Sequence, residues 1–133
     1  MQILLGGVIP AAVGAIAGVL VGVSVGAYYG LGALAVIGSF LAGFEHRDGW
    51  GGADRGFISG AIYGAALLLV HAAIGNEAKV SLGSFKPLFA LLTAIIGMFI
   101  CAAGGRVARM YRERAGIFIT DPDPERRSRH RAT

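Results

Sequence analysis

The chain has 133 residues, of which 55% are hydrophobic and 15% are charged, whereas a soluble domain has about 25% charged residues. Its single cysteine, Cys101, excludes an intrachain disulfide framework and a cluster of thiolate metal ligands. The net charge of +4 does not indicate a nucleic-acid partner, because eight of the twelve basic residues lie in the last 28 positions, as in a segment that flanks a membrane.

Three stretches of the sequence contain no Asp, Glu, Lys or Arg: residues 1–44, 56–76 and 87–105. A helix of about 20 residues crosses the hydrocarbon core of a bilayer. The second and third stretches are therefore long enough for one span each, and the first is long enough for two spans joined by a tight turn. The sequence predicts an all-α fold, a bundle of four transmembrane helices.

The first two predicted spans cover residues 3–27 and 31–47. Tyr28 and Tyr29 lie between them and are typical of the membrane–water interface. A turn near Ser24 is the alternative, which would lengthen the second helix at its start. We prefer the later turn because of the two tyrosines.

The third and fourth predicted spans cover residues 56–74 and 87–105. The segment 45–55 is polar and rich in glycine, so we expect a loop there. The chain then divides into a transmembrane domain, 1–105, and a basic juxtamembrane helix with a disordered cytoplasmic tail, 106–133.

Glycine recurs at every fourth position in the first and third spans. Residues four apart lie close together on a helix surface, so such glycines form a groove in which a neighbouring backbone can lie. The pattern predicts packing within one bundle, with self-association into an oligomer as the alternative. The expected packing residues are Gly14, Gly18, Gly22, Gly26, Gly56, Gly60, Gly64 and Gly97.

The two halves of the predicted bundle resemble each other in sequence. Residues 14–18 align with 60–64, and residues 37–42 align with 96–101. Two repeated helical hairpins of the same orientation would account for this similarity. Chance matches in a composition rich in glycine and alanine are the alternative.

A small set of polar residues offers candidate functional groups. The cluster before the third span is either a polar gate or docking patch, or a solvated loop whose opposite charges pair weakly. His71, near the far end of the third span, is an ionisable group within the membrane; we expect a neutral imidazole hydrogen-bonded across helices. The cluster consists of Glu45, His46, Arg47, Asp48, Asp54 and Arg55.

The segment after Gly105 predicts a basic helix with two faces. Its arginines fall on the side opposite Val107, Met110 and Tyr111. We expect this helix to bend along the inner membrane surface and to attract anionic lipid headgroups. A simple cytoplasmic extension of the fourth helix is the alternative. The expected headgroup ligands are Arg106, Arg109 and Arg112.

Two sequence stretches, residues 38–44 (GSFLAGF) and 55–61 (RGFISGA), resemble small, glycine-rich, multi-pass membrane proteins that are grouped only as families of unknown function. Gly38-Ser39-Phe40 is also similar to a stretch of the fluoride channels, but Ala35 stands where those channels have asparagine. Small multidrug transporters carry a glutamate in their first span, and no acidic residue precedes Glu45.

The sequence contains no recognisable catalytic constellation, phosphate-binding loop or metal-ligand spacing, so we expect neither an enzyme nor a cofactor. The expected function is structural: a membrane component that packs or oligomerises through glycine grooves, with the bilayer and a copy or another membrane protein as partners. A small oligomeric channel or transporter is the alternative. Residues 45–55 and the segment after 105 together carry more basic residues than residues 75–86 do. Because basic residues favour the cytoplasmic side of a membrane, we expect a protein of the cell membrane with both termini in the cytoplasm.

Overall fold

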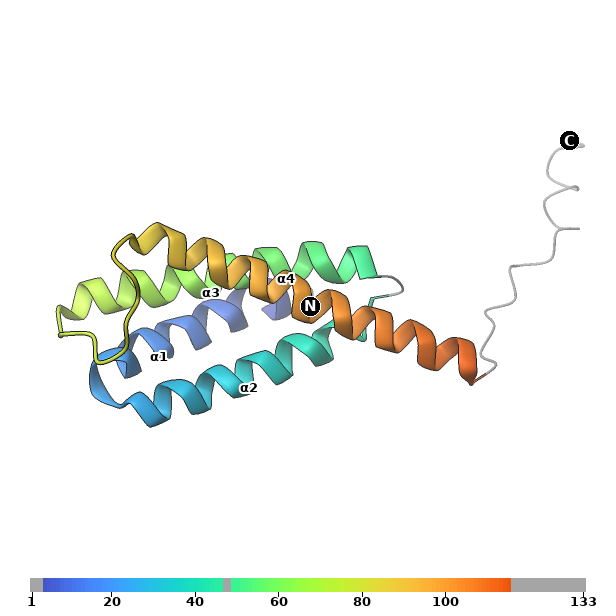
Figure 1. The fold of residues 1–133 in the computed structure, drawn as a ribbon, viewed down its shortest axis with the longest axis horizontal. Helices are drawn as coiled ribbons and strands as arrows, with labels where there is room; N and C mark the ends of the chain where they lie inside the picture. The colour runs from blue at the N-terminus through green and yellow to red at the C-terminus, as the bar shows by residue number, and fades with distance from the viewer. Residues whose placement is uncertain (1–3, 47–48, 116–133) are drawn as a thin grey trace, which may run out of the picture.

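A computed structural model describes residues 4–46 and 49–115, and nearly all of these are helical. The predicted all-α bundle of four membrane-length helices is confirmed (Figure 1). A short π-helix precedes the first long helix. The elements are η1 (Leu4–Val8), α1 (Ile9–Val23), α2 (Val25–Gly43), α3 (Gly49–Ile74) and α4 (Lys86–Arg114).

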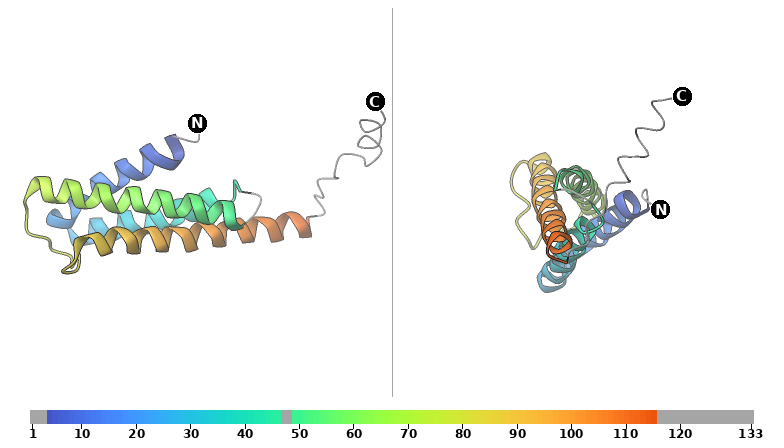
Figure 2. Two further views of the ribbon diagram at one scale, coloured as in Figure 1. Left: turned by 90° about the horizontal axis from the view of Figure 1, so that it is seen from above. Right: turned by 90° about the vertical axis from the view of Figure 1, so that its right-hand side faces the viewer.

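Helix α3 is the centre of the bundle. It packs along α4 over the most extensive interface and along α1 over the next, while α2 packs mainly on α4. Helices α1 and α3 run in one direction, and α2 and α4 run in the other (Figures 1 and 2). The two hairpins therefore share an orientation but not a packing, because α3 and α4 contact each other far more than α1 and α2 do.

The first predicted span, 3–27, ends too late. The chain breaks at Ser24, which is extended (φ −147°, ψ 116°) between two helices. The Ser24 hydroxyl accepts a hydrogen bond from the Ala27 N–H at 3.4 Å, and serine favours such N-cap positions because its oxygen satisfies an unpaired donor. The second span is therefore α2, residues 25–43, rather than 31–47, and the two tyrosines lie near its beginning.

Pro10 stands at the start of α1, directly after the π-helix. In an α-helix the N–H of residue 10 would donate to the carbonyl of residue 6, but proline has no N–H. The Ser59 hydroxyl of α3 donates to the Gly6 carbonyl at 3.1 Å. This bond satisfies a main-chain group that proline would otherwise leave unpaired in the membrane.

The third and fourth helices are longer than predicted. Helix α3 begins at Gly49 instead of 56, so most of the expected loop 45–55 is helical. Helix α4 continues without interruption through Arg114, and Ala108 is buried beyond the predicted end. The basic segment is therefore a straight extension of α4 and does not bend away from it; residues 116–133 lie outside the described residues.

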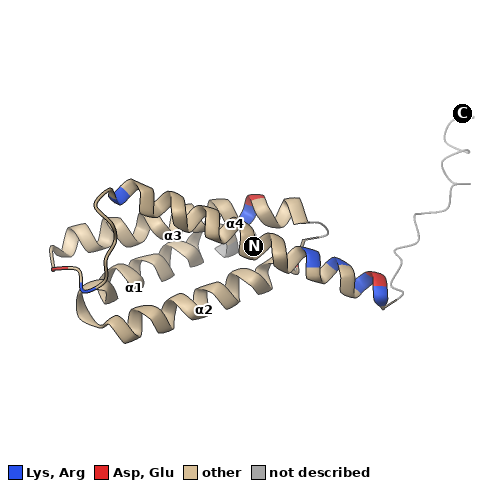
Figure 3. Cartoon of the chain, in the orientation of Figure 1, with Lys and Arg blue, Asp and Glu red and all other residues tan. Residues whose placement is uncertain are grey.

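Many large apolar side chains are exposed on the outside of the bundle, and its small core consists of alanine, cysteine and a few larger apolar side chains. Leu34 and Leu69 are 66% and 71% exposed, whereas Ala17, Val21 and Leu67 are fully buried. Charged residues lie toward the two ends of the bundle and on the extension of α4 (Figure 3). The bundle thus has an apolar middle and charged ends, and its four helices are long and apolar enough to cross a membrane.

Candidate functional site

The interface between α3 and α4 is built on glycine. A Cβ added at Gly56 would lie against the carbonyl of Gly97, and one added at Gly97 would lie against the carbonyl of Gly56. A Cβ at Gly60 would meet the carbonyl of Thr93, and one at Gly64 would meet the Thr93 hydroxyl. These four glycines were predicted from their spacing, and each lets two backbones approach where a side chain would hold them apart.

Thr93 adds a polar link to this interface. Its hydroxyl lies 3.0 Å from the Gly60 carbonyl of α3 and 2.9 Å from the Ala90 carbonyl of its own helix. Hydrogen bonds between helices in a membrane contribute about 0.6 kcal/mol on average and up to about 2 kcal/mol. The contact therefore supplements the glycine packing and fixes the register of α3 against α4.

The interface between α1 and α3 uses the first glycine series. Gly14 lies against the Tyr63 backbone and Gly18 against the Leu67 carbonyl, and a Cβ at Gly22 would lie 3.0 Å from the Asn76 Cβ. Gly26 differs, because nothing lies within 4 Å of its Cβ position. It falls in α2, beyond the break at Ser24, and so leaves the face that the first three glycines share.

Three close approaches involve glycines that are not among the expected packing residues. A Cβ at Gly43 would meet the Cys101 carbonyl, and one at Gly104 would meet the Phe40 carbonyl, so this pair forms the crossing of α2 and α4. A Cβ at Gly52 would lie 2.8 Å from the Cys101 carbonyl. Gly52 begins the four-residue spacing that continues through Gly56, Gly60 and Gly64, but it is not among the expected packing residues.

The loop between α3 and α4 closes one end of the bundle. The Lys79 N–H donates to the Val21 carbonyl at 3.0 Å, and the Lys79 Nζ donates to the Val23 carbonyl at 2.9 Å. Leu82 is 7% exposed and joins the core formed with Val21 and Leu67. The loop thus satisfies carbonyls that the end of α1 leaves unpaired.

His71 lies near this closed end and is 8% exposed. A Cβ at Gly18 would lie 3.2 Å from the His71 backbone nitrogen, which places the residue at the interface of α1 and α3. The expected hydrogen bond from its imidazole across helices is not found among the described residues. Among the described residues, 4–46 and 49–115, His71 is the one polar residue that is buried.

The opposite end is closed by charged groups. Arg55 forms an ion pair with Glu45 at 3.1 Å, with the Arg55 side chain 16% exposed and the Glu45 side chain 58% exposed. Arg112 donates to the Phe44 carbonyl at 2.7 Å and to the His46 carbonyl at 3.4 Å. The predicted pairing of opposite charges is therefore present, while Arg47 and Asp48 lie outside the described residues.

The three predicted headgroup arginines have different surroundings. Arg112 binds the end of α2, and Arg109 pairs with Glu113 at 2.8 Å along α4. Arg106 is exposed, and its aliphatic stem lies beside Gly49 at the start of α3. Arg112 is thus engaged within the protein, and Arg106 presents its charge outward.

Replacing Arg112 with glutamine should lower the melting temperature in mild detergent. The arginine supplies positive charge and two hydrogen bonds just beyond the C-terminus of α2, at the carbonyls of Phe44 and His46. We expect a cost of about 1–2 kcal/mol. Arg114→Gln is the matched control, since Arg114 is exposed on the same helix. Equal melting temperatures for the two variants would contradict the tie between α2 and α4.

The described residues contain no group of three or more His, Cys, Asp and Glu residues that could hold a metal ion. The buried His46 Nδ1 has no hydrogen-bond partner in that part of the chain, and no second titratable group is found paired with it. No protein family model, curated protein or solved structure matches the chain.

Proposed function

We propose that this chain is a multi-pass protein of the cell membrane with a structural or assembly role and no enzymatic activity. The observation that carries this proposal is the nature of the helix interfaces. Glycine backbones meet main-chain atoms between α1 and α3, between α3 and α4, and between α2 and α4. Interfaces of this kind favour rigid packing in lipid.

The proposed orientation places both termini in the cytoplasm. The charges that support it are five arginines toward the Glu45 end, against two lysines at the other end among the described residues. Positive residues near short loops favour the cytoplasmic side. The arginines are Arg55, Arg106, Arg109, Arg112 and Arg114, and the lysines are Lys79 and Lys86.

The partner in this proposal is a second copy or another membrane protein, and α2 is the helix that would meet it. Gly43 is the only buried residue of α2. Nothing lies within 4 Å of the Cβ positions of Gly26, Gly30 and Gly38. These positions leave room for a backbone from outside the chain.

A small oligomeric channel or transporter is the second proposal, and the same open face of α2 favours it. Glycine contacts fill the interfaces within one chain, so a pore would lie between several copies. The bilayer is the common environment of both proposals, and neither involves a nucleic acid.

Extraction in mild detergent, followed by mass measurement and identification of bound proteins, tests the assembly role. We expect a stoichiometric partner or a defined oligomer. Gly30→Leu should weaken this association without lowering the melting temperature, because the Gly30 Cβ position is open within the chain. A chain that is always monomeric and free of other proteins would contradict the assembly role, and selective ion flux in reconstituted liposomes would favour the channel.

A further inference from the structure

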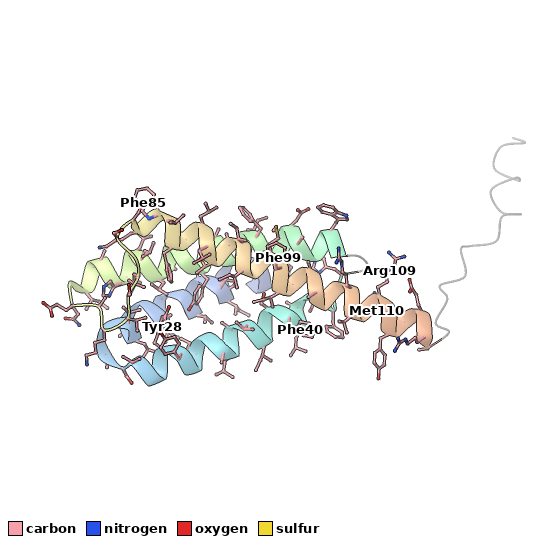
Figure 4. The ribbon with its side chains drawn as sticks, in the orientation of Figure 1. Tyr28, Phe40, Phe85, Phe99, Arg109 and Met110 are labelled. Atoms are coloured by element: carbon pink, nitrogen blue, oxygen red, sulfur yellow. The ribbon has the colours of Figure 1, made fainter. Side chains whose placement is uncertain are left out.

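An apolar groove runs between α2 and α4 on the outside of the bundle. Its volume is about 450 Å³, and its lining is almost entirely apolar. Phe40 of α2 and Phe99 of α4 stand on its two sides (Figure 4). The remaining lining residues are Val36, Ile37, Ile100 and Ala103.

One exposed basic side chain, that of Arg106, follows the groove along α4. Arg106 lies three residues after Ala103, so it occupies the next turn on the same side of the helix. It is exposed, and no ion pair from Arg106 to another described residue is found. Arg109 and Met110 lie one turn farther on, past the end of α2 (Figure 4). The groove therefore has an apolar lining and one exposed cationic side chain, Arg106, one helical turn beyond it.

We propose that this groove holds one acyl chain of a phospholipid whose anionic headgroup binds Arg106. The inference rests on the proposed membrane location and adds a defined lipid to it. The positive charge of Arg106 is complementary to an anionic headgroup, whose phosphate is not neutralised by an ammonium group of the same lipid. A basic residue near an anionic membrane surface contributes about 1 kcal/mol of attraction.

The shape of the groove favours an acyl chain over a helix. Helices in membranes meet through small residues that let their backbones approach. This groove is walled instead by phenylalanine and branched aliphatic side chains, and Phe99 is 65% exposed. A flexible chain can fit between such side chains, whereas a helix backbone would be held away from them.

Lipid binding by the purified full chain tests the proposal. The two measurements are native mass spectrometry of retained lipid and the shift in melting temperature on adding phosphatidylglycerol or phosphatidylcholine with the same acyl chains. We expect one retained phospholipid and a larger shift with phosphatidylglycerol. Arg106→Gln should remove the difference between the two lipids.

Filling the groove should remove the lipid altogether. Ala103→Phe places a ring in the groove, and Ile96→Phe is the matched control, since Ile96 is exposed on α4 and does not line the groove. We expect loss of the retained lipid only in Ala103→Phe. Equal shifts with both lipids in the unchanged chain, or full lipid retention in Ala103→Phe, would overturn the proposal. Neither lipid measurement depends on whether a protein partner is found. A failure of the lipid proposal can therefore be distinguished from a failure of the assembly role.

Discussion

Replacing Gly60 with leucine should cost about 2–3 kcal/mol of stability, among the largest effects of a single substitution in this bundle. A Cβ at Gly60 would meet the Thr93 carbonyl and would lie 2.9 Å from the Ala94 Cα. Both atoms belong to the backbone of α4, so the contact is relieved only by moving the helix. That movement would also separate the Thr93 hydroxyl from the Gly60 carbonyl.

Cys101 provides the measurement for this variant. It is the only cysteine of the chain and is 1% exposed, so a thiol-reactive dye should label it only on unfolding. Ala65→Leu is the control, because Ala65 lies on the exposed side of the same helix. The account expects a much lower melting temperature for Gly60→Leu than for Ala65→Leu. The reverse order would show that the glycine interface does not hold α3 against α4.

Replacing Leu67 with alanine should destabilise the protein by about 2–4 kcal/mol. Leu67 is fully buried and lies in the core with Ala17, Val21 and Leu82, where three elements of the chain meet. Truncation removes packing contacts in a region whose neighbours are fixed by the approach of Gly18 to the Leu67 carbonyl. The cavity therefore cannot easily collapse.

Leu69→Ala is the matched control for this truncation, since Leu69 is 71% exposed on the same helix. Labelling of Cys101 during heating again reports unfolding. We expect Leu69→Ala to leave the melting temperature almost unchanged. If both leucine variants lose the same stability, the core placed between α1, α3 and the loop between α3 and α4 is wrong.

The fold and much of the packing could be predicted because both follow from local sequence patterns. Long stretches without charge predict spans, since the bilayer excludes unpaired charge. Glycine at every fourth position marks one helix face, and Gly14, Gly18, Gly56 and Gly60 all lie against a neighbouring backbone.

The errors arose where a local pattern was ambiguous. Ser24 and the two tyrosines both mark the end of a helix, and the structure follows the serine because its hydroxyl caps α2. Gly49 and Arg55 read as loop residues by composition, but tertiary contacts with α4 and Glu45 accompany their helical conformation. Tertiary context often overrides weak helix propensity.

The closures at the two ends could not be predicted from the sequence. Lys79 is 56 residues from Val23, and Arg112 is 68 residues from Phe44. Neither pair is marked by periodicity or by a motif, because each depends on how the helices are arranged in space. The groove between α2 and α4 was missed for the same reason, since it exists only once Gly43 and Gly104 set the helix crossing.

The central claim is that four helices cross the membrane, with the Glu45 end of the bundle in the cytoplasm and the loop between α3 and α4 outside. The accessibility of single cysteines in intact cells tests this claim most directly. The positions are Glu77, Glu113, Leu34 and Leu92, each changed to cysteine in a Cys101→Ala background. A membrane-impermeant maleimide should label position 77 in intact cells, position 113 only after permeabilisation, and positions 34 and 92 under neither condition. Labelling of 77 and 113 from the same side, or ready labelling of 34 and 92, would contradict the four-span bundle.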